Sequence, residues 1–271
     1  FRGEAMDAML KVDRVGKWFG GLEALHEVEL CVGKGEIFAL IGPNGSGKTT
    51  LLNLINGIYT PSAGTIWFQG ERISGLTPHQ ITAKGIGRTF QTIRLFPEMP
   101  VKDNVMVGRH CRTRAGIFSV VLRTPAMKTE EREIEARALE ELRFLGLADA
   151  AANLARNLPY GGQRLLEMAR ALATNPTLLL LDEPAAGMNE AETKVLMDYI
   201  AKIRDRGISV LLVEHDMNLV MTISDRIAVL NFGKKIAEGD KAAIQSNPAV
   251  IEAYLGKGIR YAQSRPGIGV V

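Results

Sequence analysis

Cysteine is scarce in this chain. Only Cys31 and Cys111 occur among its 271 residues, and their separation matches neither a pair of metal ligands nor a disulfide framework. So few cysteines are typical of a protein from a reducing compartment such as the cytoplasm.

The chain also lacks a long uninterrupted hydrophobic run. A helix that spans a bilayer needs about 20 apolar residues, whereas runs such as Leu178 to Leu181 and Val210 to Val213 are far shorter. Such short runs are typical of buried strands. The first residues, Phe1 to Leu10, include acids and no apolar centre, so no signal peptide is expected.

An excess of charge of one sign is missing as well. The net charge is +3, with 23% charged and 46% hydrophobic residues, which is ordinary for a globular protein. So mild a balance gives no reason to expect a nucleic-acid partner. The length is sufficient for a large core in one or two domains.

What the chain does have is an alternation of short apolar runs and helical segments. Leu10 to Leu30 contains turn residues at Gly20 and Gly21, which predicts antiparallel strands. Strands alternating with helices predict a parallel sheet covered by helices, an α/β fold. Later strands are expected at Glu36–Ile41, Thr65–Gln69, Leu178–Leu181, Ser209–Val213 and Arg226–Leu230. Three helices are expected: one at Thr49–Asn56, one that begins after Pro159 and ends at Ala173, and one that follows Leu181 and ends at Arg206.

The stretch from Pro97 to Asn157 is expected to be mostly helix and loop. Within it, Thr129 is a predicted N-cap, followed by acidic residues at Glu130 and Glu131 in the first turn. Gly146 is expected just beyond the end of that helix.

A glycine-rich loop gives the clearest functional signal. Its pattern, G-x-x-x-x-G-K-[ST], predicts backbone N–H groups that surround phosphate oxygens, at the positive end of the helix that follows. Lys48 is expected to reach the β and γ phosphates of a nucleotide, and the Thr49 hydroxyl to hold Mg²⁺. The predicted nucleotide contacts here are Gly42, Pro43, Asn44, Gly45, Ser46, Gly47, Lys48, Thr49 and Thr50.

Two acids follow the apolar run Leu178 to Leu181. Ligands of α/β proteins bind beyond the carboxyl ends of parallel strands, so Asp182 and Glu183 are expected at the nucleotide. Asp182 is the predicted Mg²⁺ ligand, and Glu183 the predicted general base that polarises the attacking water.

Three further signals have a plain structural alternative. His215 follows the strand Ser209–Val213 and could hold the attacking water beside Glu183, but a lone histidine is commonly structural. Gln91 follows an Arg-Thr-Phe stretch, and without further context a glutamine there is usually a surface hydrogen-bonding residue. Trp18 and Phe19 could stack on adenine or belong to the core.

These motifs, in this order, resemble those of the ABC-transporter ATPase family from about Leu10 to Leu255. The resemblance implies that Phe19 stacks on adenine, that Gln91 reaches the metal and relays to a membrane subunit, and that His215 is the switch histidine. In closer detail the chain is similar to the larger ATP-binding subunit of branched-chain amino-acid importers (the LivG type). The stretches that carry this similarity include Arg94–Met99, Gly116–Ser119, Glu183–Asn189, Glu214–Met217 and Tyr254–Gly256.

The same subgroup carries an insertion at about 108–128, whose basic run Arg109 to Arg114 could touch lipid headgroups or be a solvated loop. Asn189 stands where the wider family usually has Asp, and is usual in the subgroup. The family's signature loop reads Leu-Ser-Gly-Gly-Gln, with Tyr common in this subgroup at the first Gly, and the aligned segment here is Leu158–Gly162, with Pro159 in place of the serine. An alignment shifted by one residue restores Gly-Gly-Gln but loses the match at Leu158 and the spacing to Glu167, and the serine is missing in both. Tyr160, Gly161 and Gly162 are the predicted contacts to a nucleotide held by a partner.

The resemblance implies head-to-tail pairing, with ATP between the phosphate loop of one subunit and the signature loop of the other. The second ATP-binding subunit would be a copy of this chain or a shorter paralogue, and the other partners would be membrane-spanning permease subunits and, indirectly, a solute-binding protein outside the membrane. The location implied is the cytoplasmic face of the membrane. Ile93, Leu95 and Phe96 are candidates for the permease contact, with core packing as the alternative.

The expected organisation is one ATP-binding domain over 10–255, between an extension (1–9) and a tail (256–271). Its phosphate-loop core would comprise 10–91 and 165–240, including an antiparallel β portion, and its helical subdomain 92–164. Two other functions stay open: a non-transport ABC ATPase, and a regulatory subunit that binds ATP with little turnover.

Overall fold

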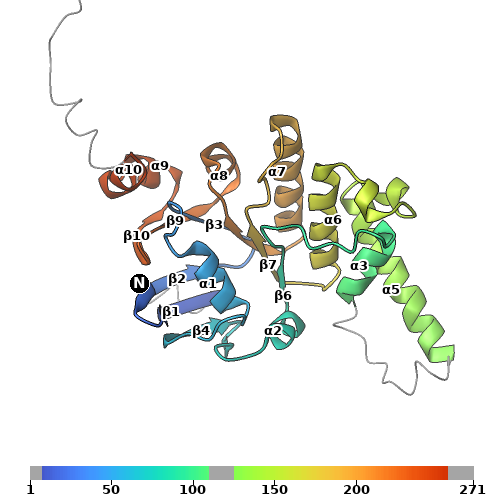
Figure 1. The fold of residues 1–271 in the computed structure, drawn as a ribbon, viewed down its shortest axis with the longest axis horizontal. Coiled ribbons are helices and arrows are strands. Elements are labelled where there is room, and N and C mark those ends of the chain that lie inside the picture. Colours follow the sequence, from blue (N-terminus) through green and yellow to red (C-terminus); the bar gives the residue numbers. More distant parts are fainter. Residues whose placement is uncertain (1–7, 110–124, 256–271) are drawn as a thin grey trace, which may run out of the picture.

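Two β-sheets form the body of the protein in a computed structural model that describes residues 8–109 and 125–255 (Figure 1). The smaller sheet has four antiparallel strands in the order β2-β1-β4-β5. It confirms the predicted antiparallel portion, because the chain turns at Gly20, with φ 57°, and Gly21. Its strands are β1 (Leu10–Phe19), β2 (Leu22–Val32), β4 (Ala63–Phe68) and β5 (Glu71–Arg72).

The larger sheet has six strands in the order β10-β9-β3-β8-β7-β6. All neighbours are parallel except β10, which pairs antiparallel with β9 at the edge. Every residue of β3, β7 and β8 is buried, which explains why these strands are continuous apolar runs. The strands are β3 (Ile37–Ile41), β6 (Ile86–Arg88), β7 (Leu178–Asp182), β8 (Ser209–Val213), β9 (Arg226–Asn231) and β10 (Lys234–Gly239).

Helices surround the larger sheet. Figure 1 shows α3, α5 and α6 gathered at one end of the molecule and α9 and α10 at the other. Leu166 of α6 and Leu142 of α5 share a buried cluster with Leu179 and Leu212 of the sheet, so the helical end is anchored on the strands that carry the predicted site. The helices are α1 (Lys48–Ile55), α2 (Pro78–Lys84), α3 (Val101–Arg109), α5 (Pro125–Phe144), α6 (Tyr160–Leu172), α7 (Glu190–Asp205), α8 (Met217–Ile223), α9 (Lys241–Ser246) and α10 (Pro248–Leu255), with single 3₁₀ turns at Ala148–Ala150 and Ala155–Asn157.

One local prediction is wrong. Thr129 does not begin a helix but lies inside α5, which starts at Pro125, because proline is favourable at the first helical position. Pro159 is the N-cap that precedes α6, with φ −59° and ψ 160°, so this helix begins directly after it, as predicted. Gly146 follows α5 with φ 72°, as expected.

Several expectations lie wholly or largely outside the described residues. Most of the insertion at 108–128, with its basic run, falls in 110–124, and the extension and tail fall in 1–7 and 256–271. Within 8–109 and 125–255, no helix has the length and apolar character that crossing a membrane requires.

Candidate nucleotide-binding and hydrolysis site

The glycine-rich loop connects β3 to α1, as the sequence predicts, and its glycines are required by close backbone packing. Gly42 has φ 151°, and a Cβ there would lie 2.1 Å from the Leu230 carbonyl oxygen. Gly47 has φ 106°, and its Cβ would lie 2.6 Å from Leu25. Any other side chain at these positions would push the loop off the sheet.

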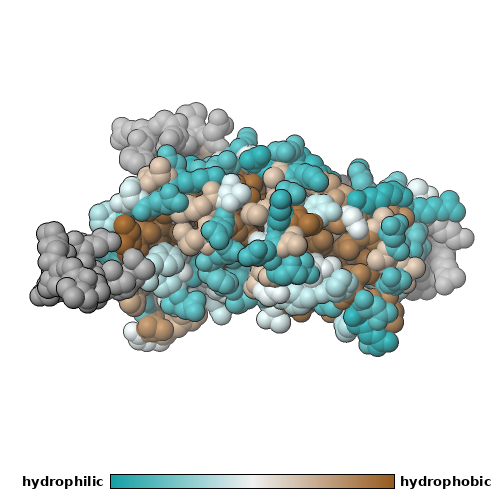
Figure 2. Space-filling view, turned by 90° about the horizontal axis from the view of Figure 1, so that it is seen from above, coloured by the Kyte–Doolittle hydropathy of each residue, from teal (hydrophilic) through white to brown (hydrophobic). Residues whose placement is uncertain are grey.

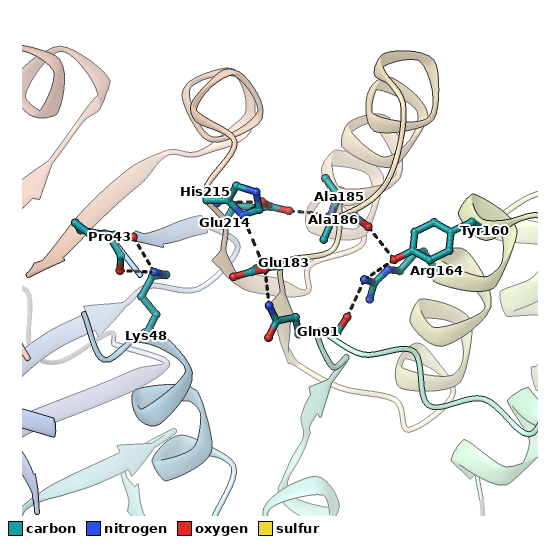
Figure 3. Close-up of polar contacts among 11 residues, drawn as sticks. Pro43, Lys48, Gln91, Tyr160, Arg164, Glu183, Ala185, Ala186, Glu214 and His215 are labelled. Atoms are coloured by element: carbon teal, nitrogen blue, oxygen red, sulfur yellow. Dashed lines mark hydrogen bonds and ion pairs between the residues drawn. The ribbon is translucent and has the colours of Figure 1, made fainter. Parts of the chain in front are cut away.

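Lys48 lies buried within this loop. Its Nζ donates hydrogen bonds to the carbonyl oxygens of Gly42, at 2.7 Å, and Pro43, at 3.0 Å (Figure 3). Burial lowers the pKa of Lys48, while the nearby carboxylates of Glu183 and Asp182 raise it. The ammonium group is therefore held at the loop by polar partners, where a phosphate would meet it.

Asp182 ends β7 and is buried. Its Oδ2 accepts a hydrogen bond from Arg88 Nη2 at 3.0 Å, and Arg88 Nη1 donates to Asn53 Oδ1 at 2.7 Å. Burial raises the pKa of Asp182, and the Arg88 hydrogen bond and charge oppose that rise. Its other oxygen, Oδ1, is buried with no hydrogen-bond partner. A buried acceptor left open in this way fits a carboxylate that receives a metal-bound water or a metal.

Glu183, Gln91 and His215 are brought together from three separate segments. Gln91 Nε2 donates to Glu183 Oε2 at 2.8 Å, and His215 Nδ1 lies 3.9 Å from the same oxygen (Figure 3). The Glu183 backbone N–H bonds to the Val213 carbonyl at 2.9 Å, and Glu183 has φ 47°. This turn at the strand end directs a partly exposed carboxylate toward Gln91, a geometry that suits a proton acceptor.

Glu214 is a residue whose role the sequence did not reveal. Its side chain is fully buried, with Oε1 accepting from the Ala185 N–H at 2.8 Å and Oε2 from the His215 N–H at 3.0 Å. Burial raises the pKa of Glu214, while N–H groups of Ala185, His215 and Asp216 lower it. Glu214 thus ties the segment after Glu183 to the segment of His215. An acid directly after a buried strand was the available signal, but its partner Ala185 lies 29 residues away in the chain.

The aromatic pair before the loop lies on the surface and not in the core. Trp18 is 42% and Phe19 40% exposed. The Phe19 ring makes an edge contact with Tyr59, with centroids 5.1 Å apart, and Lys17 Nζ lies 5.0 Å from its centroid. One face of Phe19 therefore has the exposure that stacking on a base would need, and its nucleotide role stays a prediction.

The signature segment lies apart from the phosphate loop of the same chain. Figure 3 places Tyr160 and Lys48 on opposite sides of Glu183 and His215. Tyr160 is 42% exposed, whereas Gly161 is buried, and a Cβ on Gly161 would lie 2.8 Å from Glu192 Oε1. The structure therefore does not gather Tyr160, Gly161 and Gly162 with the other predicted nucleotide contacts, and their role in holding a partner's nucleotide stays a prediction.

Asn189, which stands where the wider family usually has aspartate, has a structural role as a helix cap. Its Oδ1 accepts from the Glu192 N–H at 3.0 Å, and its own N–H donates to Glu192 Oε2 at 3.0 Å. This reciprocal pair forms a capping box at the start of α7, and an asparagine caps a helix as well as an aspartate does.

The residues proposed for a permease contact differ in exposure. Phe96 is 46% exposed, Leu95 packs against the core cluster of the helical end, and Ile93 is half-buried. Only Phe96 has the exposure expected of a contact residue, and Leu95 fits the core alternative.

The phosphate loop also faces the C-terminal helix, which the sequence did not lead us to expect. A cavity of about 440 Å³ lies between Pro43–Ser46, Phe232 and one side of α10. From the same helix, Tyr254 receives a hydrogen bond from the Gly42 N–H, which opposes the rise that burial causes in its pKa.

Comparisons with known proteins agree with this geometry. A family model described as ABC transporter matches residues 25–186, and one described as branched-chain amino acid ATP-binding cassette transporter matches 234–259. The high-affinity branched-chain amino acid transport ATP-binding protein LivG of Salmonella typhimurium is 47% identical over 250 residues, which cover 92% of this chain and 98% of the relative.

Solved structures lead to the same family. An ATP-binding cassette of an ABC transporter in its ADP conformation has a TM-score of 0.81 at 33% identity, covering 92% of this chain and 99% of that one. A dimeric bacterial ABC transporter cassette has a TM-score of 0.73 at 28% identity, covering 86% and 98%. The family model spans the phosphate loop and the acidic end of β7, the relatives cover nearly the whole fold, and this chain belongs to the family of ABC-transporter ATP-binding cassettes.

Proposed function

We propose that this chain hydrolyses ATP to power an importer of branched-chain or related amino acids. The observation that carries the hydrolytic part is the Glu183 carboxylate, held by Gln91 at 2.8 Å between Asp182 and His215. The importer class is supported by the LivG relative, by its 98% coverage, and by the family model that matches the C-terminal segment 234–259.

In this proposal each group has one task. The phosphate loop and Lys48 bind the phosphates of ATP. Glu183 accepts the proton of the attacking water, Gln91 orients the carboxylate, and His215 holds the water and Glu183 in register. Phe19 offers its exposed face to the adenine.

Magnesium fits the acceptors at the same place. Asp182, Thr49 and Gln91 are the residues proposed to hold it, and the open Oδ1 of Asp182 supports this. Bound there, the ion would neutralise charge that develops on the phosphates. Among the described residues no group of three or more His, Cys, Asp or Glu forms a metal cage. A site of few protein ligands completed by phosphates and water is what Mg²⁺ commonly uses.

The proposed active form is a head-to-tail pair with a second ATP-binding subunit, either a copy of this chain or a shorter paralogue. Lys48 and Tyr160 lie on opposite sides of Glu183 (Figure 3), which supports completion of the site by a partner. A relative with the same fold has been solved as a dimer. Permease subunits would bind this pair at the cytoplasmic face of the membrane, and a solute-binding protein would deliver the amino acid from outside.

The test is ATP-driven uptake by the assembled transporter. The chain would be produced with permease subunits and a binding protein encoded near its gene, placed in vesicles, and supplied with radiolabelled leucine. Phosphate release and uptake that both depend on ATP, and that both vanish in Lys48→Ala, are expected. Phosphate release without uptake of any branched-chain amino acid would favour a non-transport ATPase. ATP binding without turnover would favour a regulatory subunit.

A further inference from the structure

We propose that Tyr160 and Arg164 are positioning residues that connect the signature helix α6 to Glu183 of the same chain. This inference rests on the proposed function, in which the signature loop touches ATP held by the partner subunit. It adds that this contact is transmitted to the subunit's own hydrolysis site. The connection has two branches, both visible in Figure 3.

The first branch starts at the Tyr160 hydroxyl. It donates to the Ala186 carbonyl oxygen at 2.9 Å. The Ala186 N–H in turn bonds to the Glu183 carbonyl at 3.2 Å. The Tyr160 ring packs over Gly187, where a Cβ would lie 3.0 Å from the ring and where φ is 80°. The segment after Glu183 is therefore shaped to receive this tyrosine.

The second branch runs through the Arg164 guanidinium, which is buried. Its Nη1 donates to the Phe90 carbonyl at 3.0 Å, and its Nη2 to the Gln91 carbonyl at 2.8 Å. The Gln91 side chain then donates to Glu183 at 2.8 Å. One planar group thus holds the backbone on which Gln91 is mounted, a task for which a lysine has the wrong geometry.

The two branches meet at the Tyr160 oxygen. Arg164 Nη2 donates to that oxygen at 2.9 Å, while the hydroxyl itself donates to the Ala186 carbonyl oxygen. The hydroxyl thereby acts as acceptor and donor at once, and each bond strengthens the other. The Arg164 charge is balanced by Glu167, 3.6 Å away, whose Oε1 also accepts from the Arg94 N–H at 2.9 Å.

The tyrosine makes the first branch possible and joins it to the second branch, which Arg164 carries without it. The wider family usually has glycine at this position of the signature loop, which offers no side chain to bridge α6 and Ala186. Here a displacement of α6 by a partner's ATP would pull on both Ala186 and Gln91, on either side of Glu183. We therefore expect ATP at one site of a pair to favour hydrolysis at the other.

The experiment compares Tyr160→Phe with the parent across a range of ATP concentrations. Phenylalanine keeps the ring over Gly187 but removes the hydroxyl, and Tyr160 is 42% exposed, so folding should be unaffected. Loss of the hydroxyl removes two hydrogen bonds, one to Ala186 and one from Arg164, and predicts a turnover at saturating ATP lower by about fivefold or more. The Hill coefficient of ATP hydrolysis should fall from above 1 toward 1.

Two further variants make the result specific. Arg164→Lys should lower the Hill coefficient in the same way, because one ammonium cannot hold the Phe90 and Gln91 carbonyls and the tyrosine together. Tyr199→Phe is the matched control, since Tyr199 lies in α7 against Phe144, with ring centroids 6.2 Å apart. Its kinetics should match the parent. Binding of Mg-ATP to dilute, unpaired subunits should be equal in all four proteins, because that binding uses the phosphate loop alone.

Each outcome has one meaning. Tyr160→Phe with the parent's Hill coefficient and turnover would overturn the inference, as would a parent that turns over ATP with a Hill coefficient of 1. A Tyr160→Phe protein with weakened binding by single subunits, or a lowered melting temperature, would show a merely structural role and would also overturn it. A parent without any turnover would refute the proposed function itself.

Discussion

The phosphate loop and the signature segment are built on different physical principles. The phosphate loop is fixed by its backbone, because Gly42 and Gly47 have positive φ angles and no room for a Cβ. The signature segment is fixed by side chains, because Tyr160 and Arg164 bond across to Ala186 and Gln91. The phosphate loop is one stretch of sequence whose backbone packs against Leu230 and Leu25, whereas side-chain bonds join three stretches at the signature segment.

This difference predicts how each half responds to change. A segment held by backbone packing tolerates few substitutions. Its geometry should be the same whichever subunit the chain pairs with. A segment held by exchangeable hydrogen bonds can be tuned, and Pro159 already departs from the serine usual in the family. The phosphate-loop half should therefore set whether ATP is hydrolysed, and the signature half how strongly two subunits cooperate.

The largest expected effect comes from Glu183→Gln. The amide keeps the shape of the side chain but cannot accept the proton of the attacking water, so turnover should fall by about 10² or more. Phosphate release measures this, and Glu190→Gln, at an exposed position in the first turn of α7, is the matched control. Turnover near the parent value would remove Glu183 from the role of base. The same variant should pair in the presence of ATP and not without it, as measured by light scattering.

The sequence predicted the phosphate-loop half better than the signature half, for a physical reason. Strand β3, the loop and α1 follow one another without interruption, so local pattern was enough to place Lys48. Gln91 and His215 could be linked to Glu183 only through the family resemblance. Their contacts join residues 92 and 32 positions apart in the chain.

What sequence patterns could not supply are the buried polar partners. Glu214 and Arg164 carry charge into the interior, and their hydrogen bonds go to backbone groups of Ala185 and Gln91, which no side-chain pattern marks. The helix start at Pro125 was missed because Thr129 with two following acids imitates an N-terminus. Short elements such as β6 and α8 were also missed, since three to seven residues give too little periodicity.

The second prediction addresses the signature half through Pro159→Ser. Proline offers neither a hydroxyl nor an N–H to a phosphate, and here it precedes α6 without any side-chain cap. A serine would add one charge-assisted hydrogen bond across the pair, worth about 1.5 to 3 kcal/mol, or about tenfold to a hundredfold in the closed state. ATP hydrolysis by the pair of identical chains should rise accordingly.

The assembled transporter sharpens that result. If the natural partner is a shorter paralogue whose own signature completes the site at Lys48, Pro159→Ser should raise hydrolysis by identical pairs but change the transporter little. An equal rise in both would indicate that two copies of this chain work together. No change in either would mean that the missing serine is already compensated, and the proposed weakness of this half would be dropped.

The third prediction tests whether the junction between the two halves depends on Glu214. A glutamine there has one acceptor oxygen in place of two, so one of the N–H groups of Ala185 and His215 loses its partner, at a cost of about 1 to 3 kcal/mol in the free energy of unfolding. Thermal or denaturant unfolding at neutral pH measures this loss. A variant as stable as the parent would show that the junction does not depend on the Glu214 carboxylate.

The pH dependence provides the control. Because burial raises the pKa of Glu214 in the folded chain, the folded state binds a proton more readily than the unfolded state. The contribution of Glu214 to the free energy of unfolding should therefore increase as the pH falls from the pKa of Glu214 in the folded chain to the ordinary pKa of glutamate. Glu214→Gln should lose that acidic-side gain. If the free energy of unfolding depends on pH in the same way for parent and variant, Glu214 is not the group that gains a proton in the folded chain.

The smallest expected effect concerns Phe19, at the edge of the phosphate-loop half where backbone packing no longer governs. Its ring is 40% exposed and is supported on its edge by Tyr59. Leucine would keep apolar contact with a base but lose the aromatic face, so the loss should stay near the lower end of the range of about 1 to 3 kcal/mol for base stacking. We expect the Kd of the single subunit for Mg-ATP to rise by about fivefold, with turnover at saturating ATP unchanged. The affinity for inorganic triphosphate, which has no base, should not change.

Trp18→Leu is the matched control, because Trp18 is equally exposed and adjacent but lies with its ring against Gly16. If Trp18→Leu weakens binding and Phe19→Leu does not, the adenine contact belongs to the tryptophan. If neither does, the base is held elsewhere, and the phosphate loop alone accounts for the binding of ATP by one subunit.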